Sequence, residues 1–309
     1  MLPDLVTPVH RSALRSIARV VDETATPTPP SEALQALTAQ LRATPALVLT
    51  GAGVSTDSGV PDYRGPSGSL TRHRPMTYQE FRHDPDASHR YWARSFVGWR
   101  RMAAARPNLT HYALVELEQA GLVTGVVTQN VDGLHAAAGS HNLLSLHGDL
   151  ARVICLDCGH LEDRPSLDAR LEELNPGYAE SIRLDASQVN PDGDVSLDEA
   201  HVREFRMAGC RRCGSILLKP DVVYFGEPVP AERKHRADSM LDTASSLLVV
   251  GSSLAVMSGY RLALDAARQG KTVAVVNGGP GRADRRADVL WRTPVAPAFL
   301  SLLDALDLS

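Results

Sequence analysis

The stretch GAGVSTDSGVPDYRG, Gly51 to Gly65, follows the apolar run Ala46–Thr50. A strand that enters a Gly-x-Gly loop is typical of folds that hold a nucleotide phosphate. The glycines allow close backbone approach, and the following N–H groups favour an anion. Gly51 and Gly53 fit the dinucleotide fingerprint Gly-x-Gly-x-x-Gly, but Thr56 stands at its third glycine. Because Gly-x-Gly is also ordinary turn punctuation, its meaning depends on the rest of the chain.

The overall composition is that of an ordinary globular protein with one large core or two domains. The chain has 309 residues, of which 43% are hydrophobic and 22% are charged. Its net charge of -4 argues against direct nucleic-acid binding, which usually needs a basic excess. No apolar run in the sequence is long enough to cross a membrane. No motif specifies an oligomeric state, and we expect a monomer.

The first residues lack the apolar core of a secretory signal. Arg11, Arg15 and Arg19 recur at helical spacing, as in some transit peptides, whereas the acidic residues Asp22 and Glu23 are unusual there. We therefore expect a cytoplasmic enzyme with an N-terminal surface helix, and a location in the mitochondrial matrix is the alternative.

All four cysteines fall in two Cys-x-x-Cys pairs, Cys155 with Cys158 and Cys210 with Cys213, and a glycine follows each pair. Tetrahedral zinc takes four thiolates of this kind and then has no open position. The glycine relieves strain where backbone N–H groups point at sulfur. The pattern predicts one structural zinc; two redox dithiols or two disulfides are the alternatives.

Continuous apolar segments alternate with helical segments along most of the chain. The apolar segments are residues 46–49, 122–127, 142–146, 246–250 and 271–276. Strands buried on both faces belong to parallel sheets with helices on either side, so the pattern predicts an α/β fold with a Rossmann-like doubly wound parallel sheet. Shorter extended pieces are expected at residues 216–218 and 222–224.

The expected division of the chain places an N-terminal extension and linker in residues 1–31. Residues 32–65, 111–152 and 215–309 would form the Rossmann-like domain. A smaller domain would combine a helical insertion, residues 66–110, with a zinc-ribbon module, residues 153–214. Between the cysteine pairs, residues 159–209 are rich in turn formers and acids, and we expect them to form a surface loop.

Polar residues follow four of the predicted strands, beginning at Gly51, Thr128, Gly251 and Asn277. Because the carboxyl ends of parallel strands meet at one edge of a sheet, these segments should share one crevice. The small residues after both glycines suit the two halves of a pyrophosphate. Asn277 stands where a dinucleotide fold usually places an acidic residue on the ribose. For each segment alone, an ordinary β-to-α turn is the alternative.

The segment TQNVDGLH, residues 128–135, has more hydrogen-bonding side chains than packing requires, although Asp132 could serve only as a helix cap. His147 stands at a predicted strand end. A histidine titrates near neutral pH and would suit a general base if it faced a ribose; a structural histidine is the alternative.

Taken in chain order, these motifs resemble the sirtuin family over residues 35–305. The resemblance rests on GAGVS (51–55), PDYR (61–64), TQNVD (128–132), LHG (146–148), the paired Cys-x-x-Cys motifs, KPDVVYFGE (219–227) and GSSL (251–254). Within the family the chain is similar to the class II branch, that of the fourth mammalian sirtuin, through RYWAR (90–94), FVGW (96–99), CLDCG (155–159), PDGDV (191–195) and SGYR (258–261).

The resemblance implies an NAD-dependent protein-lysine deacylase. In such an enzyme the acyl oxygen attacks the ribose of NAD and nicotinamide leaves. A base then takes a proton from a ribose hydroxyl, which attacks the acyl carbon. The products are free lysine, nicotinamide and O-acyl-ADP-ribose, and the partners are acylated lysines of proteins. On the same site, mono-ADP-ribosyl transfer or lipoamidase-type activity is the alternative.

The resemblance also implies roles for individual residues. His147 is the expected base, with Asn130 as a second catalytic residue. Val222, Val223, Tyr224 and Phe225 would bind the substrate peptide by strand addition. Tyr91 and Arg94 have the Tyr-x-x-Arg spacing with which some members bind acidic acyl groups, and helix packing by Tyr91 is the alternative. The expected NAD-binding residues are Gly51, Ala52, Gly53, Ser55, Thr56, Asp62, Tyr63, Arg64, Gln129, Asn130, Asp132, Gly251, Ser252, Ser253, Asn277, Gly278 and Val295.

The sequence departs from the family pattern at a few positions. Tyr63 stands where phenylalanine is usual, Ser252 replaces the commoner threonine, and Met257-Ser258-Gly259 replaces a proline-containing run. Two other classes of protein fit less well. A dehydrogenase would have the complete glycine fingerprint and an acidic residue after its second strand, and a pure NAD-binding module would need no base such as His147.

Overall fold

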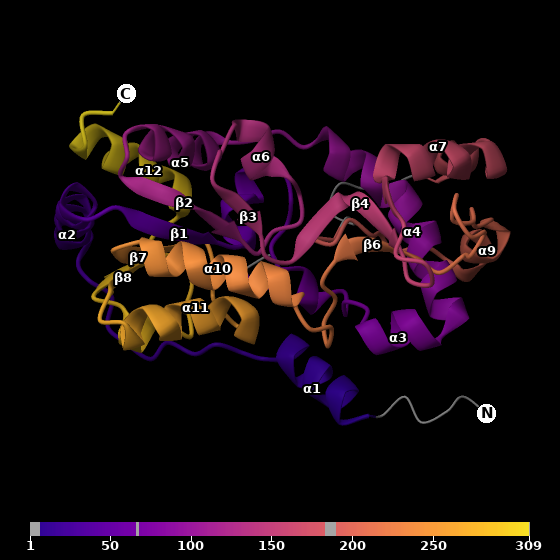
Figure 1. Cartoon of the computed structure of the whole chain (residues 1–309), viewed down its shortest axis with the longest axis horizontal. Coiled ribbons are helices and arrows are strands. Elements are labelled where there is room, and N and C mark those ends of the chain that lie inside the picture. Colours follow the sequence, from indigo (N-terminus) through magenta and orange to yellow (C-terminus); the bar gives the residue numbers. More distant parts are fainter. Residues whose placement is uncertain (1–6, 66–67, 183–189, 309) are drawn as a thin grey trace.

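The computed structural model describes residues 7–65, 68–182 and 190–308 (Figure 1). In this part of the chain, six parallel strands form the larger sheet in the order β3-β2-β1-β7-β8-β9. The chain runs outward in one direction from β1 and in the other from β7, so the order reverses between these neighbours. The predicted α/β fold is confirmed. The strands are β1 Ala46–Thr50, β2 Val123–Thr128, β3 Leu143–Ser145, β7 Ser246–Val250, β8 Thr272–Val276 and β9 Val289–Trp291.

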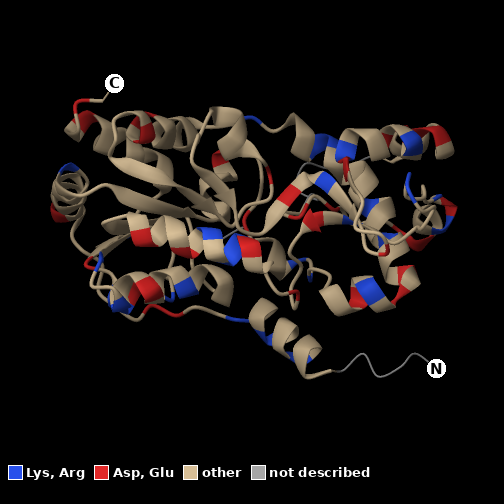
Figure 2. Ribbon diagram, viewed as in Figure 1, with Lys and Arg blue, Asp and Glu red and all other residues tan. Residues whose placement is uncertain are grey.

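Both faces of this sheet are covered by helices (Figure 1). Ala46 and Val48 of β1 face one hydrophobic core, and Leu47 and Leu49 face another, because successive side chains of a strand alternate. The first core is shared with α2 (Pro30–Ala43), α5 (Leu109–Gln119) and α12 (Val295–Ala305), and the second with α10 (Ala231–Thr243) and α11 (Met257–Arg268). In Figure 2 charged residues mark the helices, whereas the central strands carry none.

A smaller antiparallel sheet lies at the other end of the molecule, in the order β5-β4-β6 (Figure 1). Its strands are β4 Gly148–Cys155, β5 Leu161–Asp163 and β6 Leu218–Val222. β4 follows His147 directly, so this one strand leads from the edge of the larger sheet into the smaller one. The helices α3 (Tyr78–His83) and α4 (Pro85–Ala104) pack beside it and lie within the predicted helical insertion.

The interpretation of residues 159–209 as a surface loop is wrong for much of the segment. It contains β5, α7 (Arg164–Leu174), α8 (Tyr178–Ser181) and α9 (Glu199–Glu204). Leu167, Leu171 and Val195 are fully buried in the core of the smaller sheet. The apolar residues stand at helical spacing, but acids and turn formers around them hid the pattern. Residues 183–189 of this segment lie outside the described residues.

Several strand boundaries also differ from the predictions. In place of the two extended pieces expected at 216–218 and 222–224 there is one strand, β6, which spans the gap between them from Leu218 to Val222 because it pairs with β4 from Cys155 to Gly148. β4, β9, α10 and α12 were not predicted. β4 alternates between apolar and polar residues, as a strand with one exposed face does.

The N-terminal segment contains the expected helix, α1 (Pro8–Ile17), which Thr7 caps. After α1 the chain reaches the edge of the larger sheet at Thr28, whose N–H donates to the carbonyl of Leu290 in β9 at 2.8 Å. Among the described residues, no helix is long and apolar enough to cross a lipid bilayer.

Candidate active site

The loops that follow β1 and β7 touch backbone to backbone. The Gly53 N–H donates to the Gly251 carbonyl at 2.9 Å. A Cβ at Gly51 would lie 2.6 Å from Ser252 Cβ, and one at Gly53 would lie 2.8 Å from the Gly251 oxygen. Gly251 has φ +59°, the left-handed region that favours glycine. The glycines are therefore required first by the contact between the loops.

The N–H groups of this first loop are already used within the protein. Those of Gly51, Gly53, Val54 and Ser55 donate to the carbonyls of Val250, Gly251, Gly51 and Ala52. The sequence had suggested these amides as phosphate donors. The structure gives the glycines a packing role. The hydroxyls of Ser252 and Ser253 remain as groups that could meet a pyrophosphate, because those of Ser55 and Thr56 donate to Asp132 and to the Gly53 carbonyl. Of the other expected NAD residues in the loops, Ala52 and Ser253 are partly exposed and Thr56 is exposed.

A hydrogen-bonded cluster joins the end of β2 to the first loop. Asn130 Nδ2 donates to the Gly51 carbonyl at 3.1 Å and to Ser55 Oγ at 3.0 Å. Ser55 Oγ in turn donates to Asp132 Oδ2 at 2.7 Å. Burial raises the pKa of Asp132, although its hydrogen bonds from Leu134 N–H and Ser55 oppose this. Asn130 and Asp132 are therefore brought together with the glycine loop, as the sequence predicted.

Gln129 ties the end of β2 to the other two elements of the crevice. Its Nε2 donates to Ser252 Oγ at 2.8 Å and to the Thr50 carbonyl at 3.1 Å. The backbone carbonyl oxygen of Gln129 lies 3.0 Å from His147 Nδ1. The carboxyl ends of β1, β2 and β7 thus meet around one side chain, as expected for the point where the strand order reverses.

His147 lies at the entrance to β4 and bonds through both ring nitrogens. Nδ1 faces the Gln129 carbonyl, and Nε2 lies 2.7 Å from Ser258 Oγ at the start of α11. Burial lowers the pKa of His147 to about 4, while the Gln129 carbonyl opposes the change and the charge of Arg233 adds to it. His147 is therefore neutral at pH 7, and one of its ring nitrogens carries a lone pair.

Three of the expected NAD-binding residues, Asn277, Gly278 and Val295, lie around β8 and α12. Asn277 is buried, and its Nδ2 donates to the Gly279 carbonyl at 2.6 Å. Gly278 beside it is exposed, and Val295 is buried at the first turn of α12. Asn277 is thus engaged with its own turn, and a contact with a ribose stays a prediction.

The segment after the glycine loop is held in three different ways. Asp62 Oδ1 accepts from the Gly65 N–H at 2.9 Å and closes a turn. The ring of Tyr63 packs edge-on against Phe225, with centroids 6.1 Å apart. Arg64 bonds away from the glycine loops: its guanidinium donates to the carbonyls of Ser16, Ile17 and Arg19 at 3.1, 3.4 and 3.3 Å. An approach of Arg64 to a pyrophosphate requires release from these carbonyls.

Tyr91 and Arg94 lie on α4 within the smaller unit. Tyr91 is 2% exposed and packs against Phe81 and Tyr224, with ring centroids 5.4 and 5.7 Å apart. This agrees with the packing alternative. Arg94 acts electrostatically on Asp194, whose burial raises its pKa.

A carboxyl pair, Asp192 and Asp194, lies next to these residues and was not among the predicted site residues. Burial, together with the charge of Asp194, raises the pKa of Asp192 to about 8. Asp194 Oδ2 lies 3.5 Å from His73 Nε2. Both aspartates act on Tyr63 and help to raise its pKa, after burial. The pair therefore lies close to Tyr63, in the segment after the first glycine loop. The sequence around the two aspartates, PDGDV, had entered the argument only through the family resemblance.

The predicted peptide-binding segment is a strand only at its start. Val222 ends β6, and the Val223 N–H donates to the His147 carbonyl at 2.8 Å. Phe225 makes an isolated bridge with Thr77, and Tyr224 is buried. In the described part of the smaller sheet β6 pairs with β4, and on its other edge the carbonyls of Leu218, Pro220 and Val222 accept from the side chains of Trp92 and Lys219. That edge is therefore occupied along β6, and peptide binding at residues 222–225 stays a prediction.

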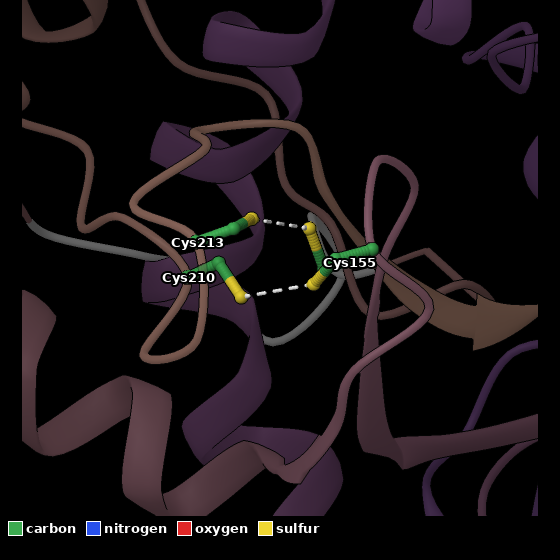
Figure 3. Close-up of side chains that lie close together, drawn as sticks. Cys155, Cys210 and Cys213 are labelled. Atoms are coloured by element: carbon green, nitrogen blue, oxygen red, sulfur yellow. Dashed lines mark hydrogen bonds between the residues drawn. The ribbon is translucent and has the colours of Figure 1, made fainter.

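The four cysteine sulfurs form one cluster, within 4.8 Å of one another (Figure 3). Cys155 Sγ lies 3.6 Å from Cys213 Sγ, and Cys158 Sγ lies 3.7 Å from Cys210 Sγ. A zinc–sulfur bond of ~2.3 Å places tetrahedral thiolates ~3.8 Å apart, whereas a disulfide needs ~2.05 Å. Gly159 and Gly214 have φ of +69° and +77°, as the knuckle prediction requires. The cluster therefore fits a structural zinc.

The comparison with known proteins agrees with this arrangement. The profile of the Sir2 family matches residues 51–258. NAD-dependent protein deacetylase 1 of Corynebacterium efficiens is 69% identical over 89% of this chain and 98% of its own length. NAD-dependent protein deacetylase 1 of Streptomyces coelicolor is 52% identical over 87% of this chain and 88% of its own length.

Solved structures show the same fold. A Sir2–p53 peptide–NAD+ structure superposes with a TM-score of 0.71 at 28% identity, covering 89% of this chain and 99% of its own. A Sir2 enzyme from a study of mechanism and regulation gives a TM-score of 0.71 at 29% identity, covering 90% and 99%. With its glycine loops, His147 and cysteine cluster in this arrangement, the chain belongs to the Sir2 family, the sirtuins.

Proposed function

We propose that this protein is an NAD-dependent protein-lysine deacylase with His147 as its general base. The observation that carries the proposal is the placement of His147. Its ring is anchored on the carbonyl of Gln129, the residue that also joins the β1 and β7 loops. A pure NAD-binding module needs no neutral histidine at this point. The relatives named as NAD-dependent protein deacetylases support the same activity.

The chemistry divides between the co-substrate and the chain. NAD supplies a ribosyl bond whose cleavage releases nicotinamide. Asn130 and Asp132, held by Ser55, would line the nicotinamide side of the crevice, and Gln129 would face the ribose. His147 would accept the proton of a ribose hydroxyl at Nε2, because Nδ1 already donates to a carbonyl. That hydroxyl oxygen could then attack the acyl carbon.

The surroundings of Arg94 favour a neutral acyl group. The charge of Arg94 is directed at Asp194, and Asp192 lies beside them with a pKa of about 8. An acidic acyl chain would bring a further carboxylate to this pair, which like-charge repulsion disfavours. We therefore propose acetyl-lysine as a better substrate than succinyl- or glutaryl-lysine. The segment 222–225 would hold the peptide through its backbone, which permits many sequences.

Three finer assignments belong with this proposal. The motifs RYWAR, PDGDV and SGYR support a place in the class II branch, near the fourth mammalian sirtuin. The bacterial relatives support the cytoplasm over a mitochondrial matrix. The net charge of -4 supports protein lysines, not nucleic acid, as the partner.

A panel of otherwise identical acetyl-, succinyl-, glutaryl- and lipoyl-lysine peptides, each incubated with NAD, tests the proposal. We expect nicotinamide release to depend on an acylated peptide and to be fastest with acetyl-lysine. Release that is equal without any peptide, with ADP-ribose attached to protein, would favour ADP-ribosyl transfer instead. Faster turnover of the succinyl or glutaryl peptide would overturn the assignment of a neutral acyl group.

A further inference from the structure

Ser258 makes a contact with the reacting end of His147 that no role assigned so far explains. Its Oγ lies 2.7 Å from His147 Nε2. Nε2 is the nitrogen that faces away from the Gln129 carbonyl, so it is the one that can act on a substrate. The sequence showed a departure here, because Ser258 lies in the Met257-Ser258-Gly259 run that replaces a proline-containing one.

The hydrogen bonds around the ring define its proton positions. A carbonyl can only accept, so the contact with Gln129 requires hydrogen on Nδ1. In neutral imidazole the other nitrogen then carries a lone pair. The Ser258 hydroxyl therefore donates to Nε2. The two contacts act from opposite sides of the ring and hold one tautomer in one orientation.

The start of α11 is built to bring Ser258 to this position. Ser258 is the second residue of the helix, and no side chain caps the helix at Val256. Gly259 follows, and a Cβ there would lie 2.4 Å from Gln129 Oε1, so the helix approaches Gln129 closely. The positive end of the α11 dipole also points at this region and disfavours a charged imidazolium.

We propose that Ser258 is a positioning residue for the deacylation step, which holds the Nε2 lone pair of His147 at the place that the ribose hydroxyl takes. The inference rests on the proposed role of His147 as base. In the step itself, the ribose hydroxyl displaces the Ser258 hydroxyl from Nε2. The ribose O–H bond breaks, its proton passes to Nε2, and its electron pair stays on the ribose oxygen. Ser258 forms no covalent bond.

The effect of the Ser258 contact on the pKa of His147 can be separated from the effects of the other groups around the ring. Arg233 of α10 is the charged group that lowers the pKa of His147, after burial, and it is itself paired with both carboxylate oxygens of Asp221 at 2.9 Å. Neither Arg233 nor Asp221 is altered by a substitution at Ser258. A hydroxyl that donates to Nε2 stabilises the neutral ring, so its removal should raise the pKa of His147.

Titration of the histidine rings by NMR in the full chain tests the proposal, with the His147 signal assigned from its loss in His147→Gln. We expect Ser258→Ala to raise the pKa of His147 by about half to one pH unit, the size of one hydrogen bond. Ser258→Thr, which keeps the hydroxyl, should restore the original value. Ser301→Ala on α12, an exposed serine, should change nothing.

Kinetics with an acetyl-lysine peptide provide the second measurement. In Ser258→Ala we expect kcat to fall about 3- to 10-fold with little change in the KM for NAD, and Ser258→Thr to recover most of it. An unchanged pKa in Ser258→Ala, or a threonine variant as impaired as the alanine one, overturns the inference. Full activity of a His147→Ala variant would instead overturn the base assignment, while the NMR titration still reports whether Ser258 contacts the ring.

Discussion

The role of His147 depends on the two atoms that its ring nitrogens face. A structural histidine is satisfied at both nitrogens by groups that never leave. Here Nδ1 faces a backbone carbonyl, whereas Nε2 faces a serine hydroxyl that a substrate hydroxyl can replace. The ring is therefore fixed on one side and exchangeable on the other, which suits a general base.

The first prediction concerns the removal of this base. His147→Ala should lower the rate of deacetylation by about 10²- to 10⁴-fold, the usual contribution of general base catalysis. Because the variant retains both glycine loops and all four cysteines, NAD affinity and zinc content should stay close to wild type. Turnover with acetyl-lysine peptide, NAD titration and metal analysis measure these quantities. His141→Ala, at an exposed histidine, is the matched control, and a similar loss of activity there would argue against the assignment.

The second prediction concerns pH. Burial lowers the pKa of His147 to about 4 from its usual 6.5. The lowered value means that the base stays deprotonated as the pH falls through 6.5, and that protonation inactivates it only near pH 4. The plot of kcat/KM for the peptide should therefore show no step near pH 6.5 from this residue. A decline of kcat/KM by half near pH 6.5, while NMR shows the His147 ring still neutral, would place the titration on another group. A decline that coincides with protonation of His147 would contradict the assigned pKa.

Among the secondary-structure elements, α1 contacts Arg64 and so connects the N-terminal segment, residues 7–19, to the loop that follows β1, here called the cofactor loop (residues 51–65). Arg64 donates to three carbonyls at the end of α1 and just beyond it. His10 of the same helix lies 3.2 Å from Thr77 Oγ1, and Ala13 is buried near Gly226, beside the predicted peptide segment. The segment thus spans from the cofactor loop to the peptide-binding side.

The third prediction follows from this contact. Deletion of residues 1–19 should lower the KM for NAD by about 2- to 10-fold, because Arg64 is then free to meet the pyrophosphate without breaking hydrogen bonds to the chain. The same deletion in an Arg64→Ala background should have no further effect, and the pair of variants forms a double-mutant cycle. An unchanged KM, or an equal change in both backgrounds, would show that Arg64 and the segment are not coupled.

Elements that depend on local sequence were predictable, and those that depend on distant contacts were not. The apolar strands and the glycine-containing knuckles at Cys155 and Cys210 follow from neighbouring residues, and the structure agrees with them. The core residues Leu167 and Leu171 were missed because polar neighbours masked their spacing. The partners of Arg64 and the contact between Ser258 and His147 join segments 45–48 and 111 residues apart, which no local pattern reports.

Across the molecule as a whole, the cysteine cluster links the end of β4 to the segment that leads into β6, and so connects two strands of the smaller sheet. Cys155 ends β4, and the second cysteine pair lies shortly before β6 (Figure 3). β4 begins next to His147, and β6 ends at the predicted peptide segment. Zinc would therefore stabilise the unit that carries both, without touching the reaction.

The fourth prediction is that Cys210→Ser lowers the zinc content from one ion per chain to near zero and lowers the melting temperature by more than about 10 °C. Structural zinc sites contribute many kcal/mol to folding, so the loss should be large. Metal analysis of reduced protein and calorimetry measure both. Arg212→Ser, at an exposed side chain of the same knuckle, should retain metal and stability. If wild-type protein contains no zinc, and added zinc does not change its melting temperature, the zinc assignment is refuted.

The proposed reaction requires that NAD be consumed in step with deacylation. Mass spectrometry of a single reaction with acetyl-lysine peptide and NAD can quantify all products together. We predict equal amounts of free-lysine peptide, nicotinamide and O-acetyl-ADP-ribose. Deacetylated peptide formed without O-acetyl-ADP-ribose, or formed in the absence of NAD, would contradict the account.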